Sequence, residues 1–202
     1  MKKWFITLSV VAVLSVGTIS YSIARNEMDD FEKGTEFAKI YQQAVDNFSK
    51  KNLTRNDLSG DITKEEIVDK IAQYKAAASV FGAEVTEQQA LEKITERKLL
   101  ADYARENDLY PSEKDIEKKI EKHINDYKEY GSELLDGMIE ELDISAEEFF
   151  YDFSRPGYEE ELVRINIIEQ LKSENEKDEN ETEQEYHNRM IKELENLISE
   201  LK

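Results

Sequence analysis

Residue types that usually perform chemistry are scarce in this sequence. The chain of 202 residues has no cysteine and two histidines, His123 and His187. Without cysteine it has no disulfide, no thiol nucleophile and no thiolate metal ligand. The histidines lie in separate helical segments among charged residues, with no serine and carboxylate arranged as in a catalytic triad. We therefore interpret both histidines as surface residues.

Adjacent glutamates are the remaining candidates for acid–base or metal chemistry. They occur at Glu65-Glu66, at Glu147-Glu148 and at residues 159–161. The helix dipole favours acidic residues in the first turn of a helix, and this accounts for most of these glutamates. The sequence has no glycine-rich phosphate loop and no H-E-x-x-H motif. It thus predicts a protein that is not an enzyme and has no cofactor or metal site.

The composition is strongly acidic and typical of a helical protein. The chain has 27 Lys and Arg against 46 Asp and Glu, which gives a formal net charge of −19. A nucleic-acid-binding protein needs a basic surface, so the charge argues against nucleic acid as a partner. Two prolines, seven glycines and 36% charged residues favour an all-α fold.

Residues 1–24 have the pattern of an export signal or a membrane anchor. Lys2 and Lys3 precede an apolar run, and Ser22 and Ala24 are small residues at the positions that a signal peptidase reads. A retained helix over residues 4–24 would also just span a bilayer. Both alternatives stay open. Either one places the rest of the chain outside the cytoplasm, anchored in the membrane or secreted.

Periodic apolar residues predict a series of capped helices. An amphipathic helix over residues 28–50 comes first, within an N-terminal segment of residues 25–55. The central element is a helical hairpin from Thr86 to Tyr127, with its apolar residues facing inward and Pro111 between its helices. Ser or Thr followed three residues later by an acid or Gln marks helix starts at Thr63, Thr86, Ser112, Ser145 and Thr182.

Three segments resemble a known family. The sequence I-T-E-R-K-L-L-A-D-Y-A-R-E-N-D-L-Y-P-S-E-K-D-I, from Ile94 to Ile116, resembles the N-terminal chaperone domain of the SurA and PrsA family. Residues 59–67 and 131–149 are similar to the segments that flank it there, although Ser59 stands where the family usually has Asn. The resemblance covers residues 56–174. It implies a multi-helix SurA N-terminal-like domain that binds unfolded or partly folded exported proteins without ATP.

The C-terminal part departs from this family. SurA-like and PrsA-like proteins usually carry a parvulin-type prolyl isomerase domain after the helical region. The residues after Ser173 are too few for such a domain, and they are acidic and helical in pattern. The resemblance therefore implies the chaperone-like module alone, without the catalytic residues of the isomerase.

Residues 175–202 are predicted to be an acidic linker and a C-terminal amphipathic helix. In the SurA family a C-terminal helix returns to pack on the N-terminal domain, and we favour the same arrangement here. The alternative is that this helix pairs with another chain.

A cluster of aromatic residues supplies the candidate binding residues. Five aromatics fall within ten positions: Phe149, Phe150, Tyr151, Phe153 and Tyr158. One interpretation is that the phenylalanines belong to the hydrophobic core. The other is that the cluster is the apolar wall of a cleft that holds unfolded segments by non-directional hydrophobic contact.

Two functions follow as expectations. The first is an extracytoplasmic, ATP-independent chaperone-like protein that binds unfolded or partly folded exported proteins, here called clients, and that reaches the membrane through its N-terminal segment. The alternative is a membrane-associated interaction module for one specific envelope partner, without general chaperone activity.

Overall fold

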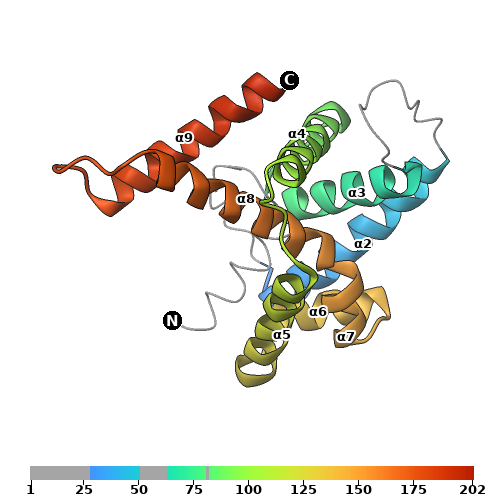
Figure 1. Cartoon of the computed structure of the whole chain (residues 1–202). Helices are drawn as coiled ribbons and strands as arrows, with labels where there is room; N and C mark the ends of the chain where they lie inside the picture. The colour runs from blue at the N-terminus through green and yellow to red at the C-terminus, as the bar shows by residue number, and fades with distance from the viewer. Residues whose placement is uncertain (1–27, 51–62, 81) are drawn as a thin grey trace.

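The computed structural model describes residues 28–50, 63–80 and 82–202. These residues form helices and connections but no strand, which confirms the predicted all-α class. No helix among them is long and apolar enough to cross a membrane, and the signal or anchor predicted at residues 1–24 lies outside the described residues. In chain order the elements are α2 (Asp30–Ser49), α3 (Lys64–Val80), α4 (Glu87–Glu106), α5 (Glu113–Tyr130), α6 (Glu133–Leu142), α7 (Ala146–Glu148), the π-helical turn η2 (Phe149–Phe153), α8 (Arg155–Glu174) and α9 (Glu183–Leu201) (Figure 1).

The helices begin where their capping residues predict. The Thr86 hydroxyl accepts a hydrogen bond from the backbone N–H of Gln89 at 3.2 Å, and the Gln89 side chain accepts one from the backbone N–H of Thr86 at 2.9 Å. This reciprocal pair satisfies two donors that a helix start leaves free. The same arrangement is present at Thr63, Ser145 and Thr182, and Ser112 caps α5 through its hydroxyl.

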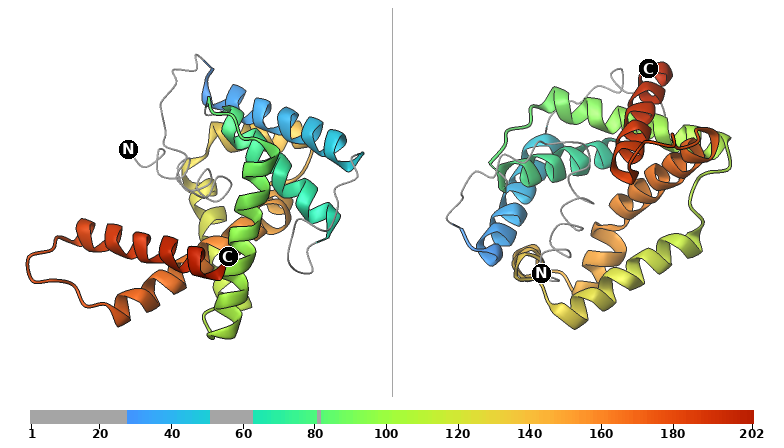
Figure 2. Two further views of the ribbon diagram at one scale, coloured as in Figure 1. Left: turned by 90° about the horizontal axis from the view of Figure 1, so that it is seen from above. Right: turned by 90° about the vertical axis from the view of Figure 1, so that its left-hand side faces the viewer.

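The predicted hairpin of residues 86–127 is wrong. Helices α4 and α5 spread apart from their connection instead of lying side by side: α4 lies above α8 and α5 below it in Figure 1, and the right-hand view of Figure 2 shows the two helices diverging. Helix α4 packs against α3, α8 and α9, whereas α5 packs against α8 and η2. The connection is held to α8, because the Asn166 amide donates a hydrogen bond to the carbonyl of Leu109 at 2.8 Å. Helix α8 is therefore the common partner of both helices.

A pair of glycines lets α2 and α6 cross at close range. Gly34 of α2 and Gly137 of α6 are both buried. A Cβ atom added at Gly34 would overlap the carbonyl oxygen of Leu134 and lie 2.9 Å from the Met138 nitrogen, and one at Gly137 would overlap the carbonyl oxygen of Phe31. Each backbone thus occupies the space that a side chain on the other helix would need. Only glycine fits at these two positions.

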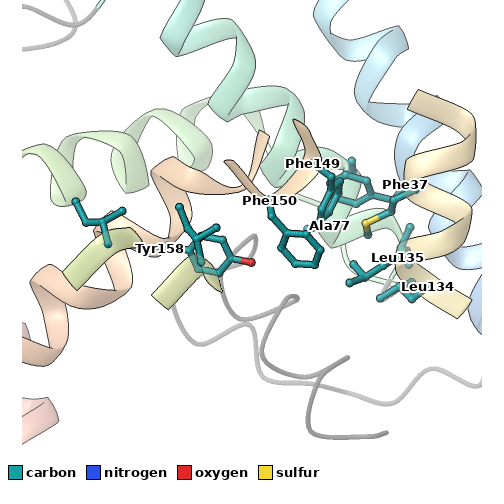
Figure 3. Packing of buried hydrophobic residues seen from close by; sticks show 12 residues of the cluster. Phe37, Ala77, Leu134, Leu135, Phe149, Phe150 and Tyr158 are labelled. Carbon is teal, nitrogen blue, oxygen red and sulfur yellow. The ribbon is translucent and has the colours of Figure 1, made fainter. Parts of the chain in front are cut away.

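The apolar residues form three clusters. The main cluster lies among α2, α3, α5, α6, η2 and the start of α8, and Figure 3 shows its packing. The second joins α2, α3 and the first half of α4, and the third joins the second half of α4 to α8 and α9. The third cluster consists of Leu100, Ala104, Val163, Ile167, Leu194 and Ile198.

Helix α9 returns to the body of the protein, which confirms the favoured alternative for the C-terminal helix. Its Leu194 and Ile198 pack in the third cluster, and the Lys202 ammonium lies 3.0 Å from a carboxylate oxygen of Glu96 on α4. The acidic connection before it is tied to the same helix. Arg189 makes an ion pair with Glu181 at 2.9 Å and also donates to a backbone carbonyl of the connection.

His123 is not a surface residue, contrary to the interpretation from the sequence, whereas His187 is exposed as predicted. The His123 side chain is only 4% exposed, and its ring stacks on Tyr158 with the centroids 4.8 Å apart. Burial lowers the pKa of His123 to about 4; Lys119 and Lys122 also lower it, while Asp126 opposes them. His123 is therefore neutral in the folded protein near pH 7.

The close crossing predicts a large effect of one methyl group. Alanine is favoured over glycine in a helix by about 1 kcal/mol, so propensity alone would make Gly34→Ala stabilising. Because the added Cβ overlaps the backbone of α6, we expect a net loss of roughly 1–3 kcal/mol in the free energy of unfolding, measured by urea denaturation with circular dichroism. Gln43→Ala, at an exposed position of the same helix, serves as the control. Wild-type stability in Gly34→Ala would refute the crossing.

The burial of His123 predicts a pH dependence of stability. Its pKa is lower in the folded protein than the ordinary value of about 6.5 in the unfolded chain, so the unfolded state binds more protons between these values and stability falls as the pH drops. Replacing it by phenylalanine removes the proton site and keeps a flat ring against Tyr158. Between about pH 7 and pH 5 the wild type should lose about 1–2 kcal/mol more than His123→Phe in urea denaturation. Parallel losses in the two proteins would show that His123 is not held neutral.

Candidate functional site

The five candidate aromatics come together in the structure, but mainly inside the core. Phe149, Phe150 and Tyr158 are at most 1% exposed and belong to the main cluster. Tyr151 and Phe153 are half-buried and pack against it, and the Phe153 ring stacks on Phe149 at 5.4 Å. The first three thus have the position of core residues, which the sequence left as one alternative. Client binding at the five residues stays a prediction.

A cleft lies elsewhere, between α3, α4 and α8. Its volume is about 490 Å³. Apolar groups supply part of its lining: Ile94, Leu100 and Ala101 from α4, and Pro156 and Val163 from α8. Charged residues of both signs complete it, together with Tyr110: Glu66, Asp69, Lys70, Arg97, Lys98, Asp102, Arg105, Glu159, Glu160 and Arg164.

Glu160 of α8 is the centre of the buried part of this cleft. Its carboxylate forms an ion pair with Arg97 of α4 and lies 3.1 Å from the ammonium of Lys70 on α3. The Arg97 guanidinium also lies over the ring of Tyr74, 4.5 Å from its centroid. One carboxylate thus links three helices, since Arg97 lies on α4 and Lys70 on α3.

Some basic groups at this point lack a direct partner. Arg97 is only 9% exposed, and its Nε and Nη2 atoms are buried without a hydrogen-bond partner. Arg164, one helical turn after Glu160, is half-buried and forms no ion pair or hydrogen bond with the described residues. Burial lowers the pKa of Arg164 and the charge of Arg97 lowers it further, while Glu96, Tyr74 and Glu160 oppose them. Two arginines and Lys70 therefore surround Glu160.

The outer part of the cleft is balanced by ion pairs. Asp102 lies 2.7 Å from Lys98 and 3.2 Å from Arg105, whose side chain is 55% exposed. The Arg105 guanidinium covers the ring of Tyr110 at 4.3 Å. Tyr110 donates a hydrogen bond to Glu159 at 3.2 Å, and burial followed by the charge of Glu159 raises the pKa of Tyr110.

The lining of the cleft combines apolar groups with acidic, basic and phenolic side chains. The cleft is lined by no histidine, serine or threonine among the described residues, so none of these can act there as a nucleophile or general base. Within the same described ranges, no three histidine or carboxylate side chains are grouped so as to hold a metal ion. The cleft can instead accept an apolar group beside a charged one.

Sequence reasoning missed this cleft, although one signal points to it. Arg97 lies three positions after Ile94 and three before Leu100, and therefore on the face of α4 that these apolar residues bury. A basic residue on a buried face requires a partner, which was the available indication. The partner itself, Glu160, could not be named because it lies on a different helix.

The ion cluster predicts an asymmetry between two adjacent glutamates. Glu160→Gln leaves Arg97 and Lys70 without their shared carboxylate, and should lower the free energy of unfolding by about 3 kcal/mol. Glu161→Gln is the matched control, since Glu161 makes a more exposed pair with Lys119 at 2.7 Å and should cost less than about 1 kcal/mol. Urea denaturation of both variants measures the two losses in the free energy of unfolding. Equal losses would contradict the role given to Glu160.

Comparison with known proteins does not assign the chain to a family. No protein-family model matches it, and neither does any curated protein or solved structure. The resemblance to the SurA and PrsA family therefore rests on the sequence motifs alone, and the function is argued from the cleft.

Proposed function

We propose that this protein is an extracytoplasmic, ATP-independent chaperone-like protein that binds unfolded or partly folded exported proteins. The observation that carries the proposal is the cleft of about 490 Å³ between α3, α4 and α8, in which apolar groups alternate with charges of both signs. Binding sites usually combine apolar walls with polar groups, and this cleft carries more charged residues than is usual. We assign the client segment to this cleft.

The chemistry of the cleft fits segments of varied sequence. Its apolar part provides non-directional attraction, and its acidic and basic side chains can each pair with an opposite charge on a client. The net charge of −19 favours a soluble complex after a client has bound. Residues 1–24 would bring the chain across the membrane and leave it either secreted or attached there. Neither a nucleotide nor catalysis is required for such binding.

A second candidate is a module that binds one specific envelope partner. A specific observation favours it: among the described residues the exposed large hydrophobics are Phe31, at 38%, and Ile165, at 40%. A chaperone that shields many aggregating chains usually offers a larger apolar surface. One cleft with few exposed apolar neighbours suits a smaller range of ligands.

Filling the cleft tests the first candidate. The full chain in lipid nanodiscs is mixed at rising ratios with a chemically unfolded protein on dilution, and light scattering follows aggregation against empty nanodiscs. We expect suppression at nearly equal amounts. Ala101 is partly exposed and lines the cleft. The substitution Ala101→Phe should fill the cleft and abolish most of the suppression. Ala146→Phe, at a partly exposed position outside the cleft, should retain it.

The remaining outcomes separate the two candidates. Wild-type protein that never suppresses aggregation, yet binds a single envelope protein saturably, would replace the first candidate by the second. Suppression that survives in Ala101→Phe would show that clients bind elsewhere than in the cleft.

A further inference from the structure

Arg97 and Arg164 line the same cleft and leave cationic groups without partners. The two Arg97 atoms without a hydrogen bond, Nε and Nη2, are fully buried, and its one ion pair uses the third nitrogen, Nη1. Arg164 has no ion pair or hydrogen bond with the described residues. Both guanidiniums remain charged at any ordinary pH. Burying a cation without a direct partner destabilises the fold, because no other interaction replaces its hydration.

Glu160 does not neutralise this part of the cleft. Its single negative charge is shared between Arg97 and Lys70, which lie on two different helices. The nearby Asp69 is occupied as well: it accepts hydrogen bonds from Tyr41 at 2.5 Å and from Gln73 at 3.0 Å, and burial raises the pKa of its carboxyl group. Glu96 is paired with Lys93 and Lys202. Each of these carboxylates thus has another cation or hydrogen-bond donor close by, although Glu96 and Glu160 also attract Arg164 at longer range and Glu160 Oε2 accepts no hydrogen bond.

We propose that the cleft binds an oxyanion, a carboxylate or a phosphate group, at Arg97 and Arg164. Guanidinium groups present several N–H donors in a planar fork that matches the two oxygens of a carboxylate or phosphate. The oxyanion adds negative charge beside Arg164, whose guanidinium is only partly buried. The Arg97 Nε and Nη2 atoms are fully buried, so this side chain has to shift toward the cleft before they can donate to the anion.

The size and lining of the cleft indicate what carries this oxyanion. A volume of about 490 Å³ is much larger than one anion, and Leu100, Ala101 and Val163 are part of the same lining. A carboxylate attached to an apolar group, such as the C-terminal residue of a polypeptide, fills both parts. The inference rests on the proposed function: the carboxylate would belong to the client segment that the cleft holds. Its test uses no aggregating client.

Isothermal titration calorimetry on the full chain, in a non-ionic detergent free of phosphate, measures this binding directly. The probes are the tripeptide acetyl-Ala-Val-Leu with a free carboxylate, the same peptide as its C-terminal amide, and inorganic phosphate. We expect the free carboxylate to bind at least about tenfold more tightly than the amide, because the amide leaves the arginines unneutralised. Tighter binding of inorganic phosphate than of the free-carboxylate peptide would support the oxyanion site and assign it to a free anion.

Arg164 is the residue to change, because replacing Arg97 would also break its ion pair with Glu160. Arg164→Gln should weaken binding of the free-carboxylate peptide at least about tenfold, and it removes a cation that has no partner in the fold. Arg189→Gln is the matched control, since this arginine lies outside the cleft lining and is paired with Glu181. It should change the affinity less than about threefold. Melting curves of both variants check that they remain folded.

Two results would overturn the inference: equal affinity for the free peptide and its amide together with no binding of phosphate, or unchanged affinity in Arg164→Gln. These results are separate from those of the aggregation assay. Carboxylate binding without suppression of aggregation would remove the chaperone function and leave the oxyanion site. Suppression without binding of either anion would remove the oxyanion site and leave the chaperone function.

Discussion

The structure depends on one helix, α8, that has packing partners on several sides. Tyr158 near its start belongs to the main cluster, and Val163 and Ile167 belong to the cluster shared with α4 and α9. Between these levels Glu160 pairs with Arg97 and Lys70, so α8 is joined to α4 by charge as well as by apolar contact and to α3 by an ion pair. A helix with partners on several sides brings polar side chains such as Glu160 into partly buried positions, even though Ile165 on the same helix is 40% exposed. The cleft and its ion cluster follow from that constraint.

Local signals made much of the helical structure predictable from the sequence. Capping residues such as Thr86 and Thr182 marked helix starts correctly, because a cap depends on residues three positions apart. The partners of each helix were harder to predict. An apolar stripe shows that a helix has a buried face but does not identify what covers it, which is why α4 and α5 were wrongly paired. The crossing at Gly34 and Gly137 was equally hidden, since those residues are far apart in the chain.

The candidate site shows the same division. The aromatic residues from Phe149 to Tyr158 were easy to notice as a group, yet composition cannot distinguish a packed core from an apolar cleft wall, and Phe149, Phe150 and Tyr158 lie in the core. His123 was misjudged because its sequence neighbours are charged, whereas its spatial neighbour is the ring of Tyr158. The cleft is made from three helices that no sequence pattern pairs. Only Arg97, on an otherwise apolar face, indicated that a charge is buried there.

The cost of the cleft bears on its function. Removing a charged group from water costs several kcal/mol unless a partner compensates. Arg164 is compensated only by the nearby charges of Glu96 and Glu160, because it forms no direct ion pair or hydrogen bond with the described residues. The fold gains little from this guanidinium, so its position is a local weakness in the absence of a ligand. A ligand that binds only the folded state stabilises it in proportion to the logarithm of the ligand's concentration. An anion bound at Arg164 would therefore offset the unfavourable free energy of partly burying this charge. Binding in the cleft would in this way stabilise the packing of α3, α4 and α8.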